Sequence, residues 1–448
     1  MAQLAKSPQR ALQIGCALAA AFALGGCPAS VDDVRPPGDQ FFYPTAIALS
    51  PDASTMFVVN ANADLLYNTG SVTVVDLDAL DALIAAPTGP GCDRDADRPG
   101  LWQCDEGAAA AGDGDRGARI GNFANDIDIQ DLGDGALRLF ITVRGDPSVT
   151  WIDYRGGQLE CAGSEAVPLC DDDNRVLRFF DDPSSSLITG EPFQIYVDPD
   201  AEYAVVTHLI NAAVSLIHTP RDGEPVLSDT LSGLFNASGS VQSALGVAGR
   251  KVPGEPESLI YITSRSENRV YMAYVEDELG PLPRLVPNQF FFLNSVTPSG
   301  NIQDSRGIAF GRDGARAYIV NRSPPALHVL DTSTTPTGQP KNEILTNVEL
   351  CRDPAEVVVA DTGRGERTYV SCFPEGLVFV VDPELGVLDA VISVGLGPNG
   401  MAVDPQRQRL YVANYLEDTI AVVDINPDSE TANEVVLKLG RPKQLGEN

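Results

Sequence analysis

The sequence predicts an all-β protein built from one repeated unit, and three observations lead to this class. The 448 residues include 41 Gly and 33 Pro, which is a turn-rich composition. Short runs of alternating or β-branched apolar residues recur along the chain, separated by D-P, D-G and G-D pairs that are typical of turns. The same succession of strand, turn, strand, loop and strand also returns many times, and such repeats decide the architecture.

The clearest copy of the unit is 397–426, GPNGMAVDPQRQRLYVANYLEDTIAVVDIN. It predicts strands at Met401–Val403, Leu410–Ala413 and Ile420–Asp424, and a fourth strand is expected at Val435–Leu439. Close copies occupy 44–77, 306–332 and 354–382, and more degenerate copies occupy 126–154, 193–219 and 242–275.

Alignment of these copies gives one equivalent residue in each of seven units: Asn60, Val143, His208, Ser264, Asn321, Cys372 and Asn414. No unit can bury both of its faces alone, so we expect seven four-stranded blades stacked in a ring, a seven-bladed β-propeller over 41–442. The wider spacing of the early units predicts insertions at about 81–120, as a long loop on one rim, and at 156–175. A two-domain β-sandwich is the alternative, and whether Phe41–Tyr43 helps to close the ring stays open. Residues 443–448 are expected to be a short tail.

The sequence of the last unit is similar to that of a known repeat. Its L-Y-V-A-N (410–414) followed by T-I-A-V-V-D-I (419–425) resembles the YVTN-type β-propeller repeats of bacterial surface and periplasmic proteins. At the level of the fold the resemblance covers nearly all of 44–440, although only about four copies keep the motif closely. It implies an exported bacterial protein.

The N-terminus reads as an export signal. Lys6 and Arg10 precede Ala11–Gly26, an apolar run too short to span a bilayer as a helix. The run ends in Leu24-Gly25-Gly26-Cys27, which resembles the lipobox of bacterial lipoproteins. The resemblance implies a signal peptide at 1–26, a lipidated Cys27 and a polar, Pro-rich tether over 27–40 in the cell envelope, with the lipid as the only membrane attachment. An ordinary secretory signal is the alternative.

The net charge and the cysteines agree with export to the cell envelope. A formal net charge of −31 makes nucleic acid an improbable partner and favours cationic partners. Six cysteines remain after Cys16 and Cys27, and their order suggests three disulfides, although six cysteines allow 15 pairings. The suggested pairs are Cys92–Cys104, Cys161–Cys170 and Cys351–Cys372. Zinc is the rival interpretation, but the sequence has no C-x-x-C and no Cys–His cluster.

Five arginines occupy equivalent places in loops that border the expected channel. Arg144, Arg265 and Arg322 follow second strands, and Arg306 and Arg352 precede first strands. They could form a positive funnel for an anionic ligand, with His208 as a possible neighbour. The alternative, which the abundance of acids favours, is that each arginine pairs with a nearby carboxylate such as Asp146, Glu267, Asp304 or Asp353.

The remaining site candidates are weak. Asp93, Asp95 and Asp97 form a D-x-D-x-D run that could hold Ca²⁺, but the EF-hand pattern fails, and a solvated acidic loop is the alternative. No nucleophile elbow or phosphate-binding loop is present. We therefore expect a non-catalytic module that binds an envelope protein or an extracellular polymer. The alternatives are a lactonase-like hydrolase that uses the channel mouth and a passive surface-layer or adhesive protein.

Overall fold

The computed structural model describes residues 34–442 apart from 88–89, 96–97, 99, 110–116, 162–166, 172–174, 179–189, 211, 236–242, 256, 266, 278–279 and 294–303. The chain divides into two units, Met1–Arg35 and Pro36–Asn448, and the architecture below is that of the second. The expected signal peptide, Cys27 and the tail lie outside the described residues. Among the described helices, none has the length and apolar character that a membrane crossing requires.

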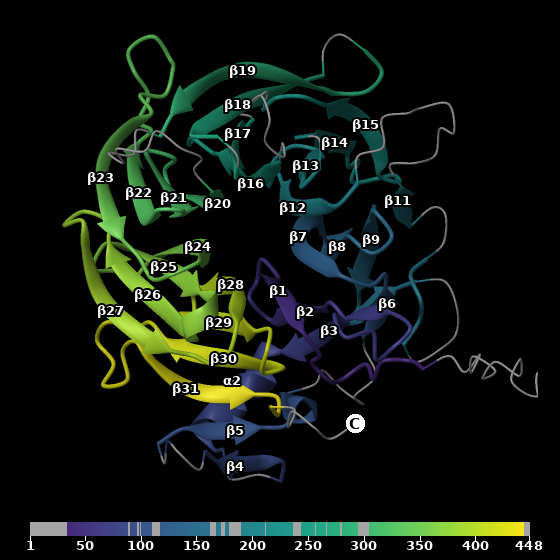
Figure 1. Cartoon of the computed structure of the whole chain (residues 1–448). Coiled ribbons are helices and arrows are strands. Elements are labelled where there is room, and N and C mark those ends of the chain that lie inside the picture. Colours follow the sequence, from purple (N-terminus) through teal and green to yellow (C-terminus); the bar gives the residue numbers. More distant parts are fainter. Residues whose placement is uncertain are drawn as a thin grey trace, which may run out of the picture. The chain divides into compact units, whose positions relative to one another are not determined.

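Seven sheets, each with a core of antiparallel strands, form a ring, which confirms the predicted seven-bladed β-propeller (Figure 1). Blade 1 contains β1 (Pro44–Leu49), β2 (Thr55–Asn60), β3 (Gly70–Asp76) and β6 (Ala118–Ile120). Blade 2 contains β7 (Ala124–Gly133), β8 (Ala136–Val143), β9 (Ser148–Arg155) and two short strands that both pair with β9, β10 (Gln158–Glu160) and β11 (Val176–Arg178). Blade 3 contains β12 (Pro192–Val197), β13 (Tyr203–His208), β14 (Val214–His218) and β15 (Val226–Leu231).

The later blades follow the same order of strands. Blade 4 contains β16 (Ala244–Arg250), β17 (Leu259–Ser264), β18 (Arg269–Glu276) and β19 (Arg284–Phe292). Blade 5 contains β20 (Ser305–Phe310), β21 (Arg316–Arg322), β22 (Pro325–Asp331) and β23 (Glu343–Glu349). Blade 6 contains β24 (Pro354–Asp361), β25 (Glu366–Cys372), the short 3-10 helix η2 (Phe373–Glu375), β26 (Leu377–Asp382) and β27 (Val387–Ser393). Blade 7 begins with β28 (Pro398–Asp404), β29 (Arg409–Asn414), β30 (Thr419–Asp424) and β31 (Glu434–Leu439).

The apolar core lies between the blades. Each of the seven interfaces between neighbouring blades holds one cluster of buried apolar side chains. In β2, Phe57 and Val59 belong to the cluster shared with blade 2, while Met56 and Val58 belong to the cluster shared with blade 7. Because alternate side chains of a strand face opposite ways, a second strand buried on both faces must be apolar throughout.

Two local features of the sequence recur for clear reasons. Tyr261, Tyr318, Tyr369 and Tyr411 hold the same place in four second strands and are all buried, so each fills the space between two blades. At the D-P turns, the carboxylate of the aspartate holds the turn. Asp404, for example, accepts hydrogen bonds from the backbone N–H groups of Gln406 and Arg407, both at 2.9 Å.

The first insertion closes the ring. Instead of the expected long loop, it contains α2 (Leu77–Ala85), β4 (Cys92–Arg94), β5 (Trp102–Cys104) and the 3-10 helix η1 (Glu106–Ala109). We call Cys92–Cys104 the clasp. Its β4–β5 hairpin adds to the outer edge of blade 7, where β5 runs parallel to β31 and pairs Leu437 with Trp102 and Leu439 with Cys104. Blade 7 thus becomes a six-stranded sheet with two strands from another part of the chain.

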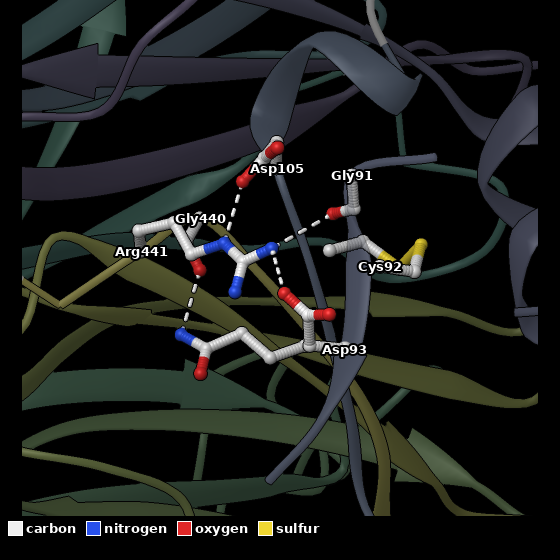
Figure 2. Close-up of a disulfide and its surroundings, with 8 residues drawn as sticks. Gly91, Cys92, Asp93, Asp105, Gly440 and Arg441 are labelled. Atoms are coloured by element: carbon white, nitrogen blue, oxygen red, sulfur yellow. Dashed lines mark hydrogen bonds and ion pairs between the residues drawn. A yellow bond between two sulfur atoms is a disulfide. The ribbon is translucent and has the colours of Figure 1, made fainter. Parts of the chain in front are cut away.

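Polar contacts fasten the clasp to the end of blade 7 (Figure 2). Gly440 N donates to Cys104 O, and Gln103 Nε2 donates to Gly440 O, both at 2.8 Å. Arg441 forms ion pairs with Asp105 at 2.5 Å and with Asp93 at 2.9 Å. The clasp lies between β3 and β6 of blade 1 in the sequence, and it holds β31, the last strand of blade 7.

The segment Phe41–Tyr43 contributes to the same seam without forming a strand. Phe41 is buried in the cluster between blades 7 and 1, and its N–H donates to Glu106 Oε1 at 3.2 Å. The N–H of Tyr43 donates to Asp418 Oδ1 of blade 7 at 2.6 Å. The question that the sequence left open is thereby answered, because blade 7 supplies its own four strands.

The three suggested disulfides are present. Cys92–Cys104 closes the clasp, Cys161–Cys170 closes the second insertion, and Cys351–Cys372 joins the entry of blade 6 to the end of β25. The order of the cysteines therefore predicted the pairing correctly.

The double substitution Cys92→Ser/Cys104→Ser is expected to destabilise the closed ring. A bond that closes a loop with a sequence separation of 12 contributes about 3 kcal/mol in the chain-entropy model. We expect a lower melting temperature and new proteolytic cleavage within the clasp, followed by calorimetry and mass spectrometry. Unchanged melting together with an uncut clasp would show that the Cys92–Cys104 bond does not stabilise the closed ring.

Candidate functional site

The five arginines of the expected funnel lie at one end of the blades, Arg306 and Arg322 at strand ends and the other three in loops. In every blade the first residue of the first strand pairs with the last or penultimate residue of the second strand, as Pro44 does with Asn60 and Ser305 with Asn321. The loops that follow second strands and the loops that precede first strands are therefore neighbours. Blade repetition thus gathers the residues that the sequence singled out on one face.

Most of these arginines already have acidic partners. Three form ion pairs at 2.8 Å: Arg144 with Glu191, Arg306 with Asp304, and Arg322 with Asp353. Two of the pairs match acids named from the sequence, whereas Arg144 pairs with Glu191 of the next blade's entry and not with Asp146. These contacts favour the pairing interpretation over a funnel of free cations.

One carboxylate at this end gathers three arginines. The hydrogen bond from Arg322, with the nearby charges of Arg322, Arg352 and Arg306, lowers the pKa of Asp353. Within the described residues Arg352 and Arg265 form no ion pair, and Arg352 is exposed. Arg306, Arg322 and Arg352 are thus brought together, while Arg144 and Arg265 belong to other blades.

His208 is separate from this group. It is fully buried at the end of β13, where Nε2 lies 2.9 Å from Ser215 Oγ. Burial lowers its pKa to about 4, so the imidazole is neutral at physiological pH. Its contacts are those of a structural histidine.

The two described acids of the calcium candidate have separate partners. Asp93 pairs with Arg441 at 2.9 Å, and Asp95 Oδ1 accepts a hydrogen bond from Arg98 N at 2.8 Å, whereas Asp97 lies outside the described residues. Among the described residues, the one group of His, Cys, Asp or Glu close enough to share a metal is Cys351, Cys372 and Glu375. Its two cysteines are joined as a disulfide.

Sequence reasoning missed a set of polar side chains on the innermost strands. Asp126 and Asp128 of β7 accept hydrogen bonds from Ile195 N at 3.0 Å and Val197 N at 2.6 Å, so they tie blade 2 to the first strand of blade 3. Gln194 of blade 3 donates to Glu356 Oε1 of blade 6 at 2.8 Å. Since these two blades are not neighbours, the contact joins opposite sides of the ring.

Burial perturbs these carboxyl groups strongly. Burial raises the pKa of Asp128 to about 6. Burial and the neighbouring Glu356 raise the pKa of Asp126, and burial raises that of Glu356. The sequence offered one signal for this buried cluster. In Asp126-Ile-Asp-Ile, aspartates occupy the two positions that Ala46 and Ala48 hold in blade 1. Such groups can hold protons near neutral pH.

A groove of about 670 Å³ lies beside the clasp. One wall is formed by Trp102 and Arg98 of the clasp, a second by Val391 and Ser393 of β27, and a third by Asn433 and residues 434–436 at the start of β31. Arg98 Nη1 donates to Ser393 O at 3.2 Å, so the clasp also reaches blade 6. The volume is in the range of small-ligand sites.

Comparison with solved structures shows the same fold. The chain is similar to a 6-phosphogluconolactonase candidate from Bacteroides uniformis, at 12% identity and a TM-score of 0.51, covering 87% of this chain and 93% of that one. It is similar to hydrazine synthase from Kuenenia stuttgartiensis, at 15% identity and a TM-score of 0.52, covering 91% and 100%. It is also similar to the β-propeller domain of Cps50 (Swd1) from Myceliophteria thermophila, at 8% identity and a TM-score of 0.51, covering 86% and 95%.

At these identities the likeness shows the propeller fold alone. No protein-family model and no curated protein matches the sequence.

Asp128→Asn is expected to reduce the pH dependence of unfolding. Because burial raises the pKa of Asp128 to about 6 in the folded state, this carboxyl destabilises the fold progressively as pH rises from about 4 through 6. The loss is at most about 3 kcal/mol, and the neutral amide does not suffer it. Urea unfolding at pH 4 and pH 7.5 should show a smaller difference for the variant than for wild type, whereas Glu430→Gln, an exposed control, should keep the wild-type difference. An equal difference in unfolding free energy between pH 4 and pH 7.5 in all three proteins would contradict the raised pKa of Asp128.

Proposed function

We propose that this protein is an exported bacterial β-propeller, anchored in the cell envelope by a lipid on Cys27, that acts by binding. Its partner is an envelope protein or an extracellular polymer, and its membrane attachment is the lipid. The lipobox-like Leu24-Gly25-Gly26-Cys27 supports the anchor. Three disulfides support an oxidising compartment, because cytosolic proteins rarely keep such bonds.

The groove beside the clasp is the observation that carries the binding function. It is built by three segments of the chain, the first insertion, β27 and the start of β31 with the residues before it. Val391, which lines the groove, is 47% exposed, and the other apolar side chains of β27 and its turn that are exposed are Leu385, Val387 and Leu388. A concave surface continuous with exposed apolar side chains is typical of an interaction site.

The hydrolase alternative has less support in the described residues. A lactonase-like enzyme would use charged groups at the channel mouth, but Arg144, Arg306 and Arg322 are held by carboxylates there and His208 is buried. A passive surface-layer or adhesive protein, the third class, needs no groove. Binding is therefore the function that the geometry supports best.

The anchor predicts metabolic labelling by lipid. Labelled palmitate should enter the wild-type protein in bacterial cells and should be lost completely in Cys27→Ala, because no other residue is expected to be acylated. Autoradiography of the purified proteins measures this. Incorporation that survives the substitution would remove the anchor from the proposal.

The groove predicts position-dependent crosslinking in cells. Val391 and Val226 are matched sites, since both are exposed valines on the outermost strands of blades, 47% and 39% exposed. A photo-crosslinking residue at 391 should give a discrete product that requires the envelope location, whereas the same residue at 226 should give none. Products of equal yield at both positions, or none at either, would contradict a binding role for the groove.

A further inference from the structure

The groove has one aromatic surface. Trp102 lines it, while Arg94, which does not, lies over the indole ring with its Cζ 4.7 Å from the ring centroid. Arg94 therefore orients the ring, and the remaining surface of Trp102 forms part of the groove wall. Trp102 also packs against the apolar cluster between blades 7 and 1. The groove wall is therefore the part of the indole that Arg94 and this cluster leave uncovered, and an indole is apolar apart from its one N–H donor.

The polar groups of the groove are available for a ligand. Within the described part of the chain, the Trp102 indole N–H and the side chains of Asn433 and Glu434 take part in no intramolecular hydrogen bond. Asn433 precedes β31 and Glu434 is its first residue. Together they supply both donors and acceptors, which suits a ligand rich in hydroxyl groups.

The charge of the groove is balanced. Arg98 and Glu434 are the charged side chains that line it, one of each sign, in a protein whose formal net charge is −31. A strongly charged ligand would leave one of them unfavourably placed. The groove therefore suits a neutral ligand.

Some backbone groups around the groove are already bonded. β5 pairs with β31 at Leu437–Leu439, beyond the residues of β31 that line the groove, and Ser393 O of β27 accepts the hydrogen bond of Arg98. β27 is the edge strand of blade 6, so a peptide that adds a strand there is the competing occupant, and the crosslinking test separates it from a saccharide. The aromatic wall and the balanced charge favour the saccharide.

We propose that this groove binds a neutral saccharide chain, with one sugar ring against Trp102 and its hydroxyl groups bonded to Asn433 and Glu434. The C–H face of a pyranose is apolar and its rim carries hydroxyl groups, so it matches an indole bordered by an amide and a carboxylate. This inference rests on the proposed binding function and names the polymer as a glycan.

Tryptophan fluorescence can test the proposal on the purified protein. The only other tryptophan, Trp151, is 4% exposed between Arg138 and Arg175, so a ligand-dependent change reports on Trp102. The probes are neutral hexasaccharides of glucose, xylose, mannose and N-acetylglucosamine. We expect at least one to change the emission with a Kd between about 10 μM and 1 mM, the range of weak saccharide sites.

Two variants and one control make the test specific. Asn433 has a φ of 62°, which glycine adopts without strain, so Asn433→Gly removes the amide without a backbone penalty. This variant and Glu434→Ala, which removes the carboxylate, should each weaken binding about 5-fold or more, which corresponds to the loss of one hydrogen bond. Phe292→Ala, which removes an aromatic ring that is 49% exposed on blade 4, should bind as wild type does.

Absence of binding by all four saccharides at about 10 mM, or binding that neither groove variant weakens, would overturn the saccharide assignment. That result is distinguishable from failure of the proposed function. A protein crosslinked from position 391 without any saccharide binding would keep the binding role and replace the glycan by a protein partner.

Discussion

Each blade buries both faces of its second strand against its two neighbours, and the stability of this ring depends on that constraint. The seven apolar clusters lie between blades, so a blade separated from its neighbours would expose Phe57 and Val59 on one face and Met56 and Val58 on the other. Six interfaces form between blades that follow one another in the chain. The seventh, between blades 7 and 1, joins the two ends of the propeller and has the largest loop-closure entropy to overcome.

Contacts at the interface between blades 7 and 1 offset this loss of entropy. Arg407, in the turn between the first two strands of blade 7, forms ion pairs with Asp81 of α2 at 2.6 Å and with Asp404 of its own turn at 3.2 Å. The clasp adds backbone pairing to β31, and Cys92–Cys104 keeps the hairpin closed. An insertion in the first blade therefore performs the closure that a swapped strand would otherwise provide. The same insertion creates the groove, so closure of the ring and the proposed binding site share one structural cause.

The arginines have a related role. The chain has 62 acidic and 31 basic side chains, so carboxylates outnumber the cations two to one and many arginines find an acidic partner. Arg144–Glu191 and Arg322–Asp353 each join one blade to the entry of the next. Their side chains are 36–39% exposed, so each pair contributes at most about 1 kcal/mol, and their main effect is to orient the loops. The hydrogen bond between Gln194 and Glu356 likewise joins two blades, here across the inside of the ring.

The repeated sequence, the turns and the order of the cysteines are local properties of the chain. They were enough to predict seven four-stranded blades and three disulfides, because strand period, turn chemistry and the closure of short loops depend on residues that are close in the chain. The course of the first insertion, the ion partner of Arg144 and the carboxyl cluster of Asp126 and Glu356 could not be predicted in the same way. Trp102 stands in the first insertion, outside the repeated strands, and it forms a wall of the groove only because β5 lies beside β31, more than 300 residues later in the chain. Pairing across that separation depends on which edges the closed ring leaves open, and no local pattern in the chain encodes it.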